Sequence, residues 1–452
     1  MVIGGDAAGT SAAAQARRRR GPDDLSIVVF ERGRSTSYSA CGIPYWIGGV
    51  VASEDDLVAR TPAEHRRRGL DLRMGTEVTA IDLAAREVRW RSADGTGVEP
   101  FDQLVYATGS VPMRPPVPGN DAPGVFGVQT LDDGADLIAA LDAAGPQARV
   151  VVVGGGYIGL EIAEACRRRE LAVTVVDRSA TPMGTLDPDV GTFLADAVRG
   201  LGIELVLSDG VERIVVTGGR ASGVVTRSGR ELPADVVVLG LGVRPAVALA
   251  EAAGLPLGPS GGLVVDQRMR TPVAGVWAAG DCVESTHRLS GQRVVVALGT
   301  HANKQGRVAG INIGGGYATF AGVIGTAITK ICGLEVARTG LSSREADLAG
   351  FAYVTTVVDS TTTAGYLPGA PPIRLKVLAE RRTGRLLGAQ VVGEQGSAKR
   401  IDALAIAIWN GMTVEQMVSL DLAYAPPFSP VWDPVLIAAR KAVEAVETDL
   451  TR

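Results

Sequence analysis

The segment Arg149-Val-Val-Val-Val-Gly154-Gly-Gly-Tyr-Ile-Gly159 is an apolar run that ends in a glycine-rich turn. The run predicts a buried strand, and residues 160–169 after it predict a helix. In such a turn the first glycine allows a tight bend, the second lets the backbone approach a pyrophosphate, and the third lets the helix pack on the strand. Asp177 ends the next predicted strand, 172–176, at the spacing of a ribose-binding carboxylate. The segment therefore predicts a dinucleotide-binding βαβ unit with the anion at the helix N-terminus.

A second unit of this kind opens the chain with Val2-Ile-Gly4-Gly-Asp6-Ala-Ala-Gly9. A predicted helix at 11–20 and a strand at 27–30 follow, and Glu31 closes the strand 22 residues after Gly9. This unit is less regular, because Asp6 stands at the middle glycine position and the turn begins almost at Met1. Strands usually run about five residues, so we expect the natural chain to start a few residues upstream.

Two proline-containing connections suggest how the chain is divided. Pro112-Met-Arg-Pro-Pro-Val-Pro-Gly119 is typical of a linker out of the first unit, and Gly242-Val-Arg-Pro245 is typical of the return. We therefore predict an α/β protein with two Rossmann-like domains. The first comprises 1–115 and 245–325, and the second comprises 116–244.

The remaining residues, 326–452, predict a separate α+β domain. Strand-like segments at 351–358, 373–379 and 386–392 precede a predicted helix at 398–409. Thr413-Val-Glu-Gln416 then has the pattern of a capping box that opens a short helix. We interpret this region as a dimerisation domain.

Composition narrows the possible partners and compartment. The net charge of −4 and the pI near 5.6 disfavour nucleic acid, and the arginine runs at 66–68 and 167–169 are typical of solvated helix ends. The apolar run 150–160 is too short to cross a membrane. The four cysteines form no CxxC pair, so neither a disulfide scaffold nor a metal site is predicted. With no leader-like segment after Met1, we expect a cytoplasmic protein.

Two further tripeptides relate the two dinucleotide-binding units to a known superfamily. Ala107-Thr-Gly109 and Ala279-Gly-Asp281 resemble the second and third flavin motifs of the pyridine nucleotide-disulfide oxidoreductase superfamily. The resemblance covers nearly the whole chain. It implies that FAD binds the first domain, with Asp281 on its ribityl chain, and that NADH or NADPH binds the second. It also implies a homodimer.

Within that superfamily the match narrows to coenzyme A-disulfide reductase and its relatives, which include persulfide reductases and cysteine-dependent NADH oxidases. Ser39-Ala-Cys41-Gly-Ile-Pro-Tyr45, Gly365-Tyr-Leu-Pro-Gly369 and Tyr424-Ala-Pro-Pro-Phe-Ser-Pro-Val-Trp-Asp433 carry the resemblance. It implies that Cys41 is a single redox cysteine, and that Tyr366 and Tyr424 act from the partner subunit. Coenzyme A disulfide or a coenzyme A-linked persulfide would be reduced through a mixed disulfide. The alternative is an NADH oxidase that reduces oxygen at the same centre.

Three departures separate this chain from other relatives. Trp46 stands where glutathione-reductase-like enzymes have a second cysteine, so no internal disulfide can form here. None of His65, His287 and His301 precedes a proline, and Ala7 stands where peroxidases of this group carry a histidine. These departures favour thiol exchange over peroxide chemistry. A non-catalytic flavoprotein is the hypothesis from a different class, and it would not need Cys41 with its tyrosines.

The resemblance also assigns binding residues. Those predicted for FAD are Gly4, Asp6, Ala7, Ala8, Gly9, Glu31, Arg32, Ser39, Val78, Ala107, Thr108, Gly109, Gly280 and Asp281. Those predicted for NAD(P)H are Gly154, Gly156, Tyr157, Ile158, Gly159, Glu161, Asp177, Arg178 and Gly242. Arg18 and Tyr45 are predicted to bind the substrate, and Lys399-Arg400 is a weaker candidate for its phosphates.

Two electrostatic expectations follow from the residues. Asp177 favours NADH because a carboxylate repels a 2′-phosphate, but Arg178 beside it offsets that preference, so the choice stays open. Cys41 is expected near the start of a helix, where the dipole favours a thiolate. Cys166, Cys282 and Cys332 are expected to be structural.

Overall fold

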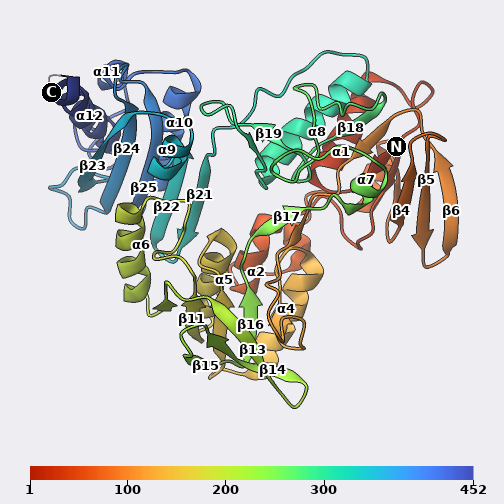
Figure 1. The fold of residues 1–452 in the computed structure, drawn as a ribbon, viewed down its shortest axis with the longest axis horizontal. Helices are drawn as coiled ribbons and strands as arrows, with labels where there is room; N and C mark the ends of the chain where they lie inside the picture. Colours follow the sequence, from red (N-terminus) through yellow and green to blue (C-terminus); the bar gives the residue numbers. More distant parts are fainter. Residues whose placement is uncertain (451–452) are drawn as a thin grey trace.

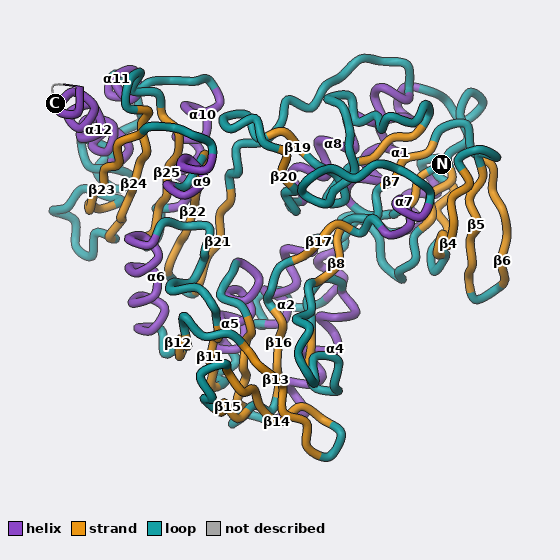
Figure 2. The backbone as a smooth tube through the Cα atoms, in the orientation of Figure 1, coloured by secondary structure: helices purple, strands orange, loops and turns teal. Residues whose placement is uncertain are grey.

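The computed structural model describes residues 1–450, and these form three lobes (Figure 1). The N-terminal residues and a later returning segment build the first lobe, which contains α1 and α8. The middle of the chain builds the second, and the C-terminal residues build the third (Figure 1). The loop 314–326, between α8 and β21, carries the chain from the first lobe to the third (Figure 2).

A five-stranded parallel sheet of order β18-β7-β1-β2-β3 forms the centre of the first lobe. Its strands are β1 (Val2–Ile3), β2 (Val28–Phe30), β3 (Asp71–Arg73), β7 (Leu104–Tyr106) and β18 (Val276–Ala278). Helices α1 (Ala7–Arg19) and α8 (Gly299–Ile313) pack on this sheet and on each other. Their backbones touch, because a Cβ on Gly306 would lie 2.2 Å from the Ala8 carbonyl oxygen.

The second lobe repeats this arrangement with the order β12-β11-β10-β16-β9, also parallel. Its strands are β9 (Val125–Phe126), β10 (Arg149–Val153), β11 (Ala172–Val176), β12 (Glu204–Val206) and β16 (Val236–Leu239), and its helices are α4 (Leu131–Ala144), α5 (Tyr157–Arg168) and α6 (Pro188–Gly200). In both sheets the strand before the glycine turn is central. The predicted recurrence of one fold is therefore confirmed.

Smaller elements flank the two sheets. Antiparallel hairpin sheets are made by β4 (Glu77–Asp82), β5 (Glu87–Ser92) and β6 (Gly95–Pro100), and by β13 (Val211–Thr217), β14 (Arg220–Thr226) and β15 (Glu231–Pro233). Also present are α3 (Pro62–Arg67), α7 (Ala248–Ala252), β19 (Ser285–Thr286) and β20 (Arg293–Val294). The two predicted linkers run side by side, because β8 (Ser110–Pro112) pairs with β17 (Val243–Pro245).

The third lobe holds an antiparallel sheet of order β21-β22-β25-β24-β23. Its elements are β21 (Ala327–Ile331), β22 (Leu334–Gly340), β23 (Tyr353–Thr361), β24 (Pro372–Glu380), β25 (Leu386–Gly393), α9 (Ser343–Leu348), α10 (Ile401–Trp409), α11 (Val414–Val418) and α12 (Pro434–Leu450). The three predicted strand segments and the helix before Trp409 are confirmed. The predicted capping box is confirmed too, since Thr413 and Gln416 cap α11 reciprocally.

The sequence places the starts of two helices too late. α1 begins at Ala7 instead of residue 11, and α5 begins at Tyr157 instead of residue 160. In both cases the residues after the tight glycine already adopt helical geometry, so the turn itself forms the first helical residues. The helix N–H groups consequently lie directly at the glycine turn.

Candidate active site

In each predicted turn the first glycine cannot be replaced by a residue that has a side chain. Gly4 has φ +102° and Gly154 has φ +106°, a region that L side chains rarely adopt. A Cβ on Gly4 would lie 2.1 Å from the Ala107 carbonyl oxygen, and one on Gly154 would lie 2.5 Å from the Gly240 carbonyl oxygen. The first glycine of each motif is thus required by its backbone and by the neighbouring strand.

The last glycine of each motif has the predicted packing role. A Cβ on Gly9 would lie 1.9 Å from the Gly4 carbonyl oxygen, and one on Gly159 would lie 1.8 Å from that of Gly154. By contrast, a Cβ on Gly156 would meet nothing within 4 Å. The space over the second turn is therefore open for a ligand.

The helices that follow these turns begin without a side-chain cap. Asp6 precedes α1 and Gly156 precedes α5, and neither makes a side-chain cap hydrogen bond. Helices α3, α4, α9 and α11 begin with a capping box, whereas α6, α8 and α10 also begin without a side-chain cap but do not follow such a glycine turn. Uncapped N–H groups at a helix N-terminus form an anion site. The two glycine-turn helices therefore fit the phosphates of a dinucleotide.

The two predicted ribose carboxylates also hold the turns. The Gly5 amide donates to Glu31 (2.7 Å), and the Gly155 amide donates to Asp177 (2.6 Å). The second oxygen of each carboxylate accepts from the loop after the strand, from Gly33 (2.6 Å) and Ser179 (2.7 Å). Carboxylate oxygens keep further lone pairs, so binding to a ribose stays a prediction.

Asp6 is the irregular position of the first motif and has an unusual environment. Its Oδ1 atom is buried without a hydrogen-bond partner. Burial and the nearby Glu31 charge raise the pKa of Asp6 to about 6. An orphaned buried oxygen at an open helix N-terminus fits a site completed by a polar ligand.

The two flavin-like tripeptides lie at the carboxyl ends of β7 and β18, beside the first glycine turn. The Ala107 amide donates to Ile3 O (2.8 Å), and the Ala279 amide donates to Tyr106 O (3.0 Å). Gly280 donates to Gln305 Oε1 (2.8 Å), and Asp281 accepts from the Ser110 hydroxyl (3.0 Å). This edge of a parallel sheet is where nucleotides bind in such folds.

Cys41 comes from the first lobe by sequence but sits on the second. It lies in the helical turn Ala40–Gly42, directly before α2 (Ile43–Ile47). Ile43 and Ile47 are fully buried in the core of the second lobe, and Arg169 of that lobe donates to Ile47 O (2.7 Å). The Cys41 thiol remains exposed. The buried side chains of α2 thus hold the exposed Cys41 thiol on the second lobe.

The expected lowering of the Cys41 pKa is wrong for this structure. Although the residue is exposed, partial desolvation and the nearby carboxylates Glu161 and Asp281 raise the pKa of its thiol. α2 is only five residues long, and its dipole does not outweigh two negative charges. The same carboxylates show that Cys41 lies near both the α5 helix and the end of β18.

Side chains of the third lobe reach the cysteine region. The Thr329 hydroxyl donates to Glu161 (2.6 Å), and Lys330 lies 3.0 Å from Glu164. Burial, followed by Glu161 and Glu164, raises the pKa of Tyr45, which borders a small hollow with both carboxylates. Sequence reasoning missed Thr329 and Lys330, because their role depends on contacts between distant segments.

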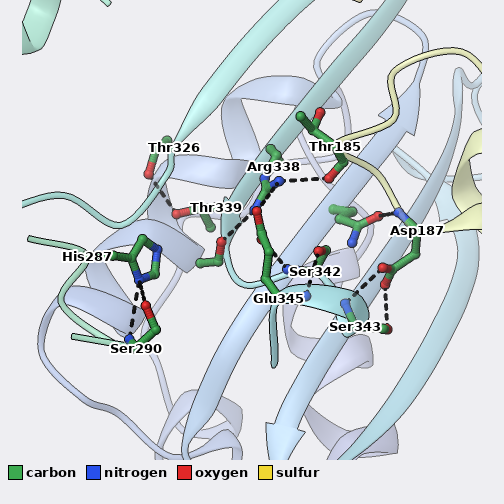
Figure 3. Close-up of polar contacts among 12 residues, drawn as sticks. Thr185, Asp187, His287, Ser290, Thr326, Arg338, Thr339, Ser342, Ser343 and Glu345 are labelled. Atoms are coloured by element: carbon green, nitrogen blue, oxygen red, sulfur yellow. Dashed lines mark hydrogen bonds and ion pairs between the residues drawn. The ribbon is translucent and has the colours of Figure 1, made fainter. Parts of the chain in front are cut away.

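A second polar network joins the nucleotide lobe to the third lobe (Figure 3). Arg338 in β22 is buried and donates to Thr185 O (2.8 Å), and it forms an ion pair with Glu345 (Figure 3). Thr185 also lies near Tyr157, whose pKa is raised chiefly by burial. The loop after Asp177 is therefore held by the C-terminal lobe.

Tyr366 and Tyr424 lie on the third lobe and are 75% and 50% exposed. Tyr366 is in the loop between β23 and β24, and Tyr424 follows α11. The Ala364 amide donates to Pro426 O (2.9 Å), which joins the two segments. Rings this exposed are free to contact a second copy of the chain.

The remaining predicted residues occupy varied positions. Ala7 and Ala8 form the first turn of α1, Gly109 has φ +69°, Ile158 is in the first turn of α5, Gly242 has φ +85°, and Arg32, Ser39 and Arg178 are exposed. Val78 is different, because its side chain is buried in the core and only its backbone can contact a ligand.

The candidate phosphate-binding residues differ in availability. Arg18 is exposed in the last turn of α1, and its guanidinium lies 3.4 Å from Gln15 Oε1. Arg400 is 12% exposed and already donates to carbonyls and to Asp433. Arg400 is therefore unsuited to bind substrate phosphates, whereas Arg18 remains a candidate.

The other cysteines behave as predicted. Cys166 and Cys282 are buried, and burial raises the pKa of each to about 12. Cys332 is half-buried in the turn between β21 and β22, and burial raises its pKa as well. These thiols are structural in character.

Comparison with known proteins agrees with this geometry. The family model described as pyridine nucleotide-disulphide oxidoreductase matches residues 1–306, and the model of the dimerisation domain of these proteins matches 326–434. The chain therefore belongs to the pyridine nucleotide-disulphide oxidoreductase family, and it is an oxidoreductase. No helix among residues 1–450 combines the length and apolarity needed to cross a bilayer.

Three similar proteins narrow the branch. A Methanocaldococcus jannaschii protein named NADH oxidase is 35% identical over 98% of both chains. A Pyrococcus abyssi protein named NAD(P)H sulfur oxidoreductase (CoA-dependent) is 37% identical over 97% of both. The solved structure of an NAD-dependent persulfide reductase from A. fulgidus matches with a TM-score of 0.95 at 39% identity, over 99% of this chain and 83% of that one.

Proposed function

We propose that this chain is an FAD-dependent NAD(P)H:disulfide oxidoreductase in which Cys41 is the single redox cysteine. The observation that carries the proposal is the position of the exposed Cys41 thiol, near enough to Glu161 of α5 and Asp281 after β18 for both charges to act on it. Each carboxylate belongs to one of the two sites that fit a dinucleotide. The sulfur- and persulfide-related relatives favour coenzyme A disulfide or a coenzyme A-linked persulfide as the substrate.

The residues around each glycine turn fit their cofactors. The open N-terminus of α1, Asp6 and the Asp281 region would hold FAD, and the open N-terminus of α5 with Asp177 would hold NADH or NADPH. When bound, these cofactors supply a hydride and pass its electron pair to sulfur. An exposed free thiol also fits a reducing compartment such as the cytoplasm.

Cys41 performs the sulfur chemistry. Its thiolate attacks a disulfide RSSR, so that a Cys41–SR bond forms, the S–S bond breaks, and one thiolate RS⁻ leaves. An electron pair then cleaves the mixed disulfide, which restores the Cys41 thiolate and releases the second RS⁻. Two protons complete the two RSH products. Reduction of a disulfide by one NAD(P)H is thereby balanced.

Proton delivery and substrate binding fall to exposed side chains. Tyr366 and Tyr424 of a second copy would donate to the departing sulfur, a general-acid role in which geometry decides. Arg18 and Tyr45 would contact the coenzyme A portion. The role in trans requires a homodimer, which the matched dimerisation domain supports.

Steady-state turnover under nitrogen tests the proposal. We expect NAD(P)H to be consumed with coenzyme A disulfide, and Cys41→Ser to abolish this turnover while NAD(P)H-driven reduction of ferricyanide persists. The second candidate, an NADH oxidase, is favoured by the similarity to the protein of that name. Consumption of NAD(P)H only after air is admitted would select the oxidase. If Cys41→Ser leaves disulfide turnover unaffected, the Cys41 sulfur has no role in the reaction.

A further inference from the structure

Arg400 of the third lobe bonds four acceptors in three stretches of chain. It ends the helical turn Ala398–Arg400 before α10, and its side chain is 12% exposed. The guanidinium donates to Thr362 O (2.8 Å), Phe428 O (2.9 Å) and Gly396 O, and to the Asp433 carboxylate (3.0 Å). No long-range bond of this kind is made by its neighbour Lys399, which is 76% exposed and pairs with Asp402.

Two of these acceptors belong to the segments that carry the tyrosines. Thr362 lies four residues before Tyr366, and Phe428 lies four residues after Tyr424. One nitrogen atom, Nη2, donates to both carbonyls. The amide of Ala364, which donates to Pro426 O (2.9 Å), is the second link between the same two segments. Arg400 therefore sets the position of one tyrosine segment relative to the other.

Asp433 fixes the clamp to the beginning of α12. It accepts from Arg400, from the buried Ser429 hydroxyl (3.0 Å) and from the Val435 amide (2.9 Å). The Arg400–Asp433 pair is shielded, at 12% and 13% exposure. A shielded, charge-assisted pair is stronger than a pair at the surface. The segment 424–433 is thus held at both its middle and its end.

The rings of Tyr366 and Tyr424 lie outside this network of hydrogen bonds. At 75% and 50% exposure, neither Tyr366 nor Tyr424 is fixed by a pocket of its own chain. Their placement depends on the backbone beneath them. Only a guanidinium has enough N–H groups in a rigid fork to hold three carbonyls and a carboxylate at once.

We propose that Arg400 is a positioning residue that clamps the 361–371 and 424–433 segments, so that Tyr366 and Tyr424 meet the Cys41 of a second copy as one unit. This inference rests on the proposed function. It adds a residue that touches neither substrate nor cofactor and acts through the two tyrosines. Disulfide reduction depends on the clamp, whereas transfer of electrons from NAD(P)H to a dye does not.

The experiment uses the FAD-loaded dimer with Arg400→Met, Arg400→Lys and the control Arg381→Met, because Arg381 of the same lobe pairs with Asp449 at 50% and 27% exposure. We expect amide hydrogen exchange in peptides 361–371 and 424–433 to speed up by about tenfold or more in Arg400→Met, because several acceptors lose their donor. Coenzyme A disulfide turnover should fall by a similar factor, with ferricyanide reduction unchanged. Arg400→Lys should restore part of the loss, and Arg381→Met should behave like the wild type.

A combined variant separates positioning from general damage. If Arg400 acts through the two tyrosines, adding Arg400→Met to Tyr366→Phe/Tyr424→Phe should cause no further loss, since coupled residues are not additive. Additive losses would overturn the proposal. If Arg400→Met fails to fold, Asp433→Asn removes the paired charge and should produce the same pattern at smaller size.

The outcomes also distinguish this inference from the function on which it rests. Suppose that Tyr366→Phe and Tyr424→Phe lose turnover, while Arg400→Met and Asp433→Asn keep normal turnover and normal amide hydrogen exchange. That result would overturn the clamp and leave the proposed function standing. Normal turnover in both tyrosine variants would overturn the tyrosine role and the clamp together, while the dependence on Cys41 would still be measured separately.

Discussion

Lys376 Nζ lies 3.0 Å from a carboxylate oxygen of Asp187, and the two side chains are only 7% and 3% exposed. Asp187 precedes α6 in the second lobe, and Lys376 is in β24 of the third. Asp187 also accepts from the Ser343 amide (2.8 Å) and hydroxyl (2.7 Å), and its own amide donates to Gln390 (2.7 Å) (Figure 3). This buried pair is a main connection between the nucleotide lobe and the dimerisation domain.

Lys376→Met should destabilise the protein strongly. It leaves the buried Asp187 carboxylate without its cation, and breaking a buried pair from one side costs about 3 kcal/mol. We expect a lower urea midpoint by circular dichroism. Arg199→Met is the control, because Arg199 pairs with Asp196 at the surface of α6 (50% and 71% exposed), and such pairs contribute less than about 1 kcal/mol. Equal effects of the two changes would contradict the buried role.

The pH dependence of that difference follows from Asp187. Burial alone would raise the pKa of Asp187, but hydrogen bonds from Ser343 and Lys376 outweigh it and hold the pKa below its ordinary value. A lowered pKa contributes stability that is present above the unfolded value of about 3.9 and is lost as the pH falls through the folded value. The gap between wild type and Lys376→Met should therefore be present at pH 7 and shrink as the pH falls, first because Asp187 of the variant becomes protonated and then because Asp187 of the wild type does.

The two glycine-turn units can be predicted from the sequence, because constraints within each βαβ unit determine their structure. Gly4, Gly9, Gly154 and Gly159 each meet a backbone constraint within one βαβ unit, and strand 172–176 was predicted to the residue. The extent of the helices was missed by a few residues, since the turn residues themselves become helical.

Contacts between lobes could not be predicted in the same way. The pKa of Cys41 depends on Glu161 and Asp281, which lie 120 and 240 residues away along the chain, so the helix-dipole argument from its own neighbours gave the wrong direction. The sequence offers Arg400 with Lys399 as a weaker candidate for substrate phosphates, but the tertiary structure uses the donors of Arg400 within the lobe. Burial of a charged side chain is decided by segments distant in sequence.

Glu161→Gln should make Cys41 reactive at lower pH. The raised pKa of the thiol means that the thiolate forms only at more alkaline pH, and removing the Glu161 charge removes one cause of that shift. The fold should tolerate the change, because a glutamine oxygen can still accept from Thr329. The measurement is the iodoacetamide labelling rate of the Cys41 peptide against pH. Glu164→Gln is the control, and a Glu161→Gln midpoint that stays or rises would refute the prediction.

Gly306→Ala should loosen the first lobe. The added Cβ would lie 2.2 Å from the Ala8 carbonyl oxygen, so α8 must move away from α1 at a cost of about 1–3 kcal/mol. Because Ala8 belongs to the first turn of α1, retention of FAD should weaken as well, which flavin absorbance after gel filtration measures. Gly200→Ala in α6 meets nothing within 4 Å and should instead stabilise by about 0.5–1 kcal/mol. A stable, flavin-retaining Gly306→Ala protein would show that the helices do not touch as described.

Asp177→Asn should shift the choice of nicotinamide toward NADPH. The asparagine oxygen can still accept from one of the Gly155 and Ser179 amides, which donate to different oxygens of Asp177. The change removes the negative charge that opposes a 2′-phosphate. One like charge removed at a distance of about 4 Å contributes on the order of 1 kcal/mol when water screens it and more when it is partly shielded, so the kcat/KM ratio of NADPH to NADH should rise by roughly fivefold or more. Arg178→Ala should move the ratio in the opposite direction, because the exposed Arg178 is the adjacent cation. An unchanged ratio in both variants would mean that the 2′ position of the nucleotide does not lie at the end of β11.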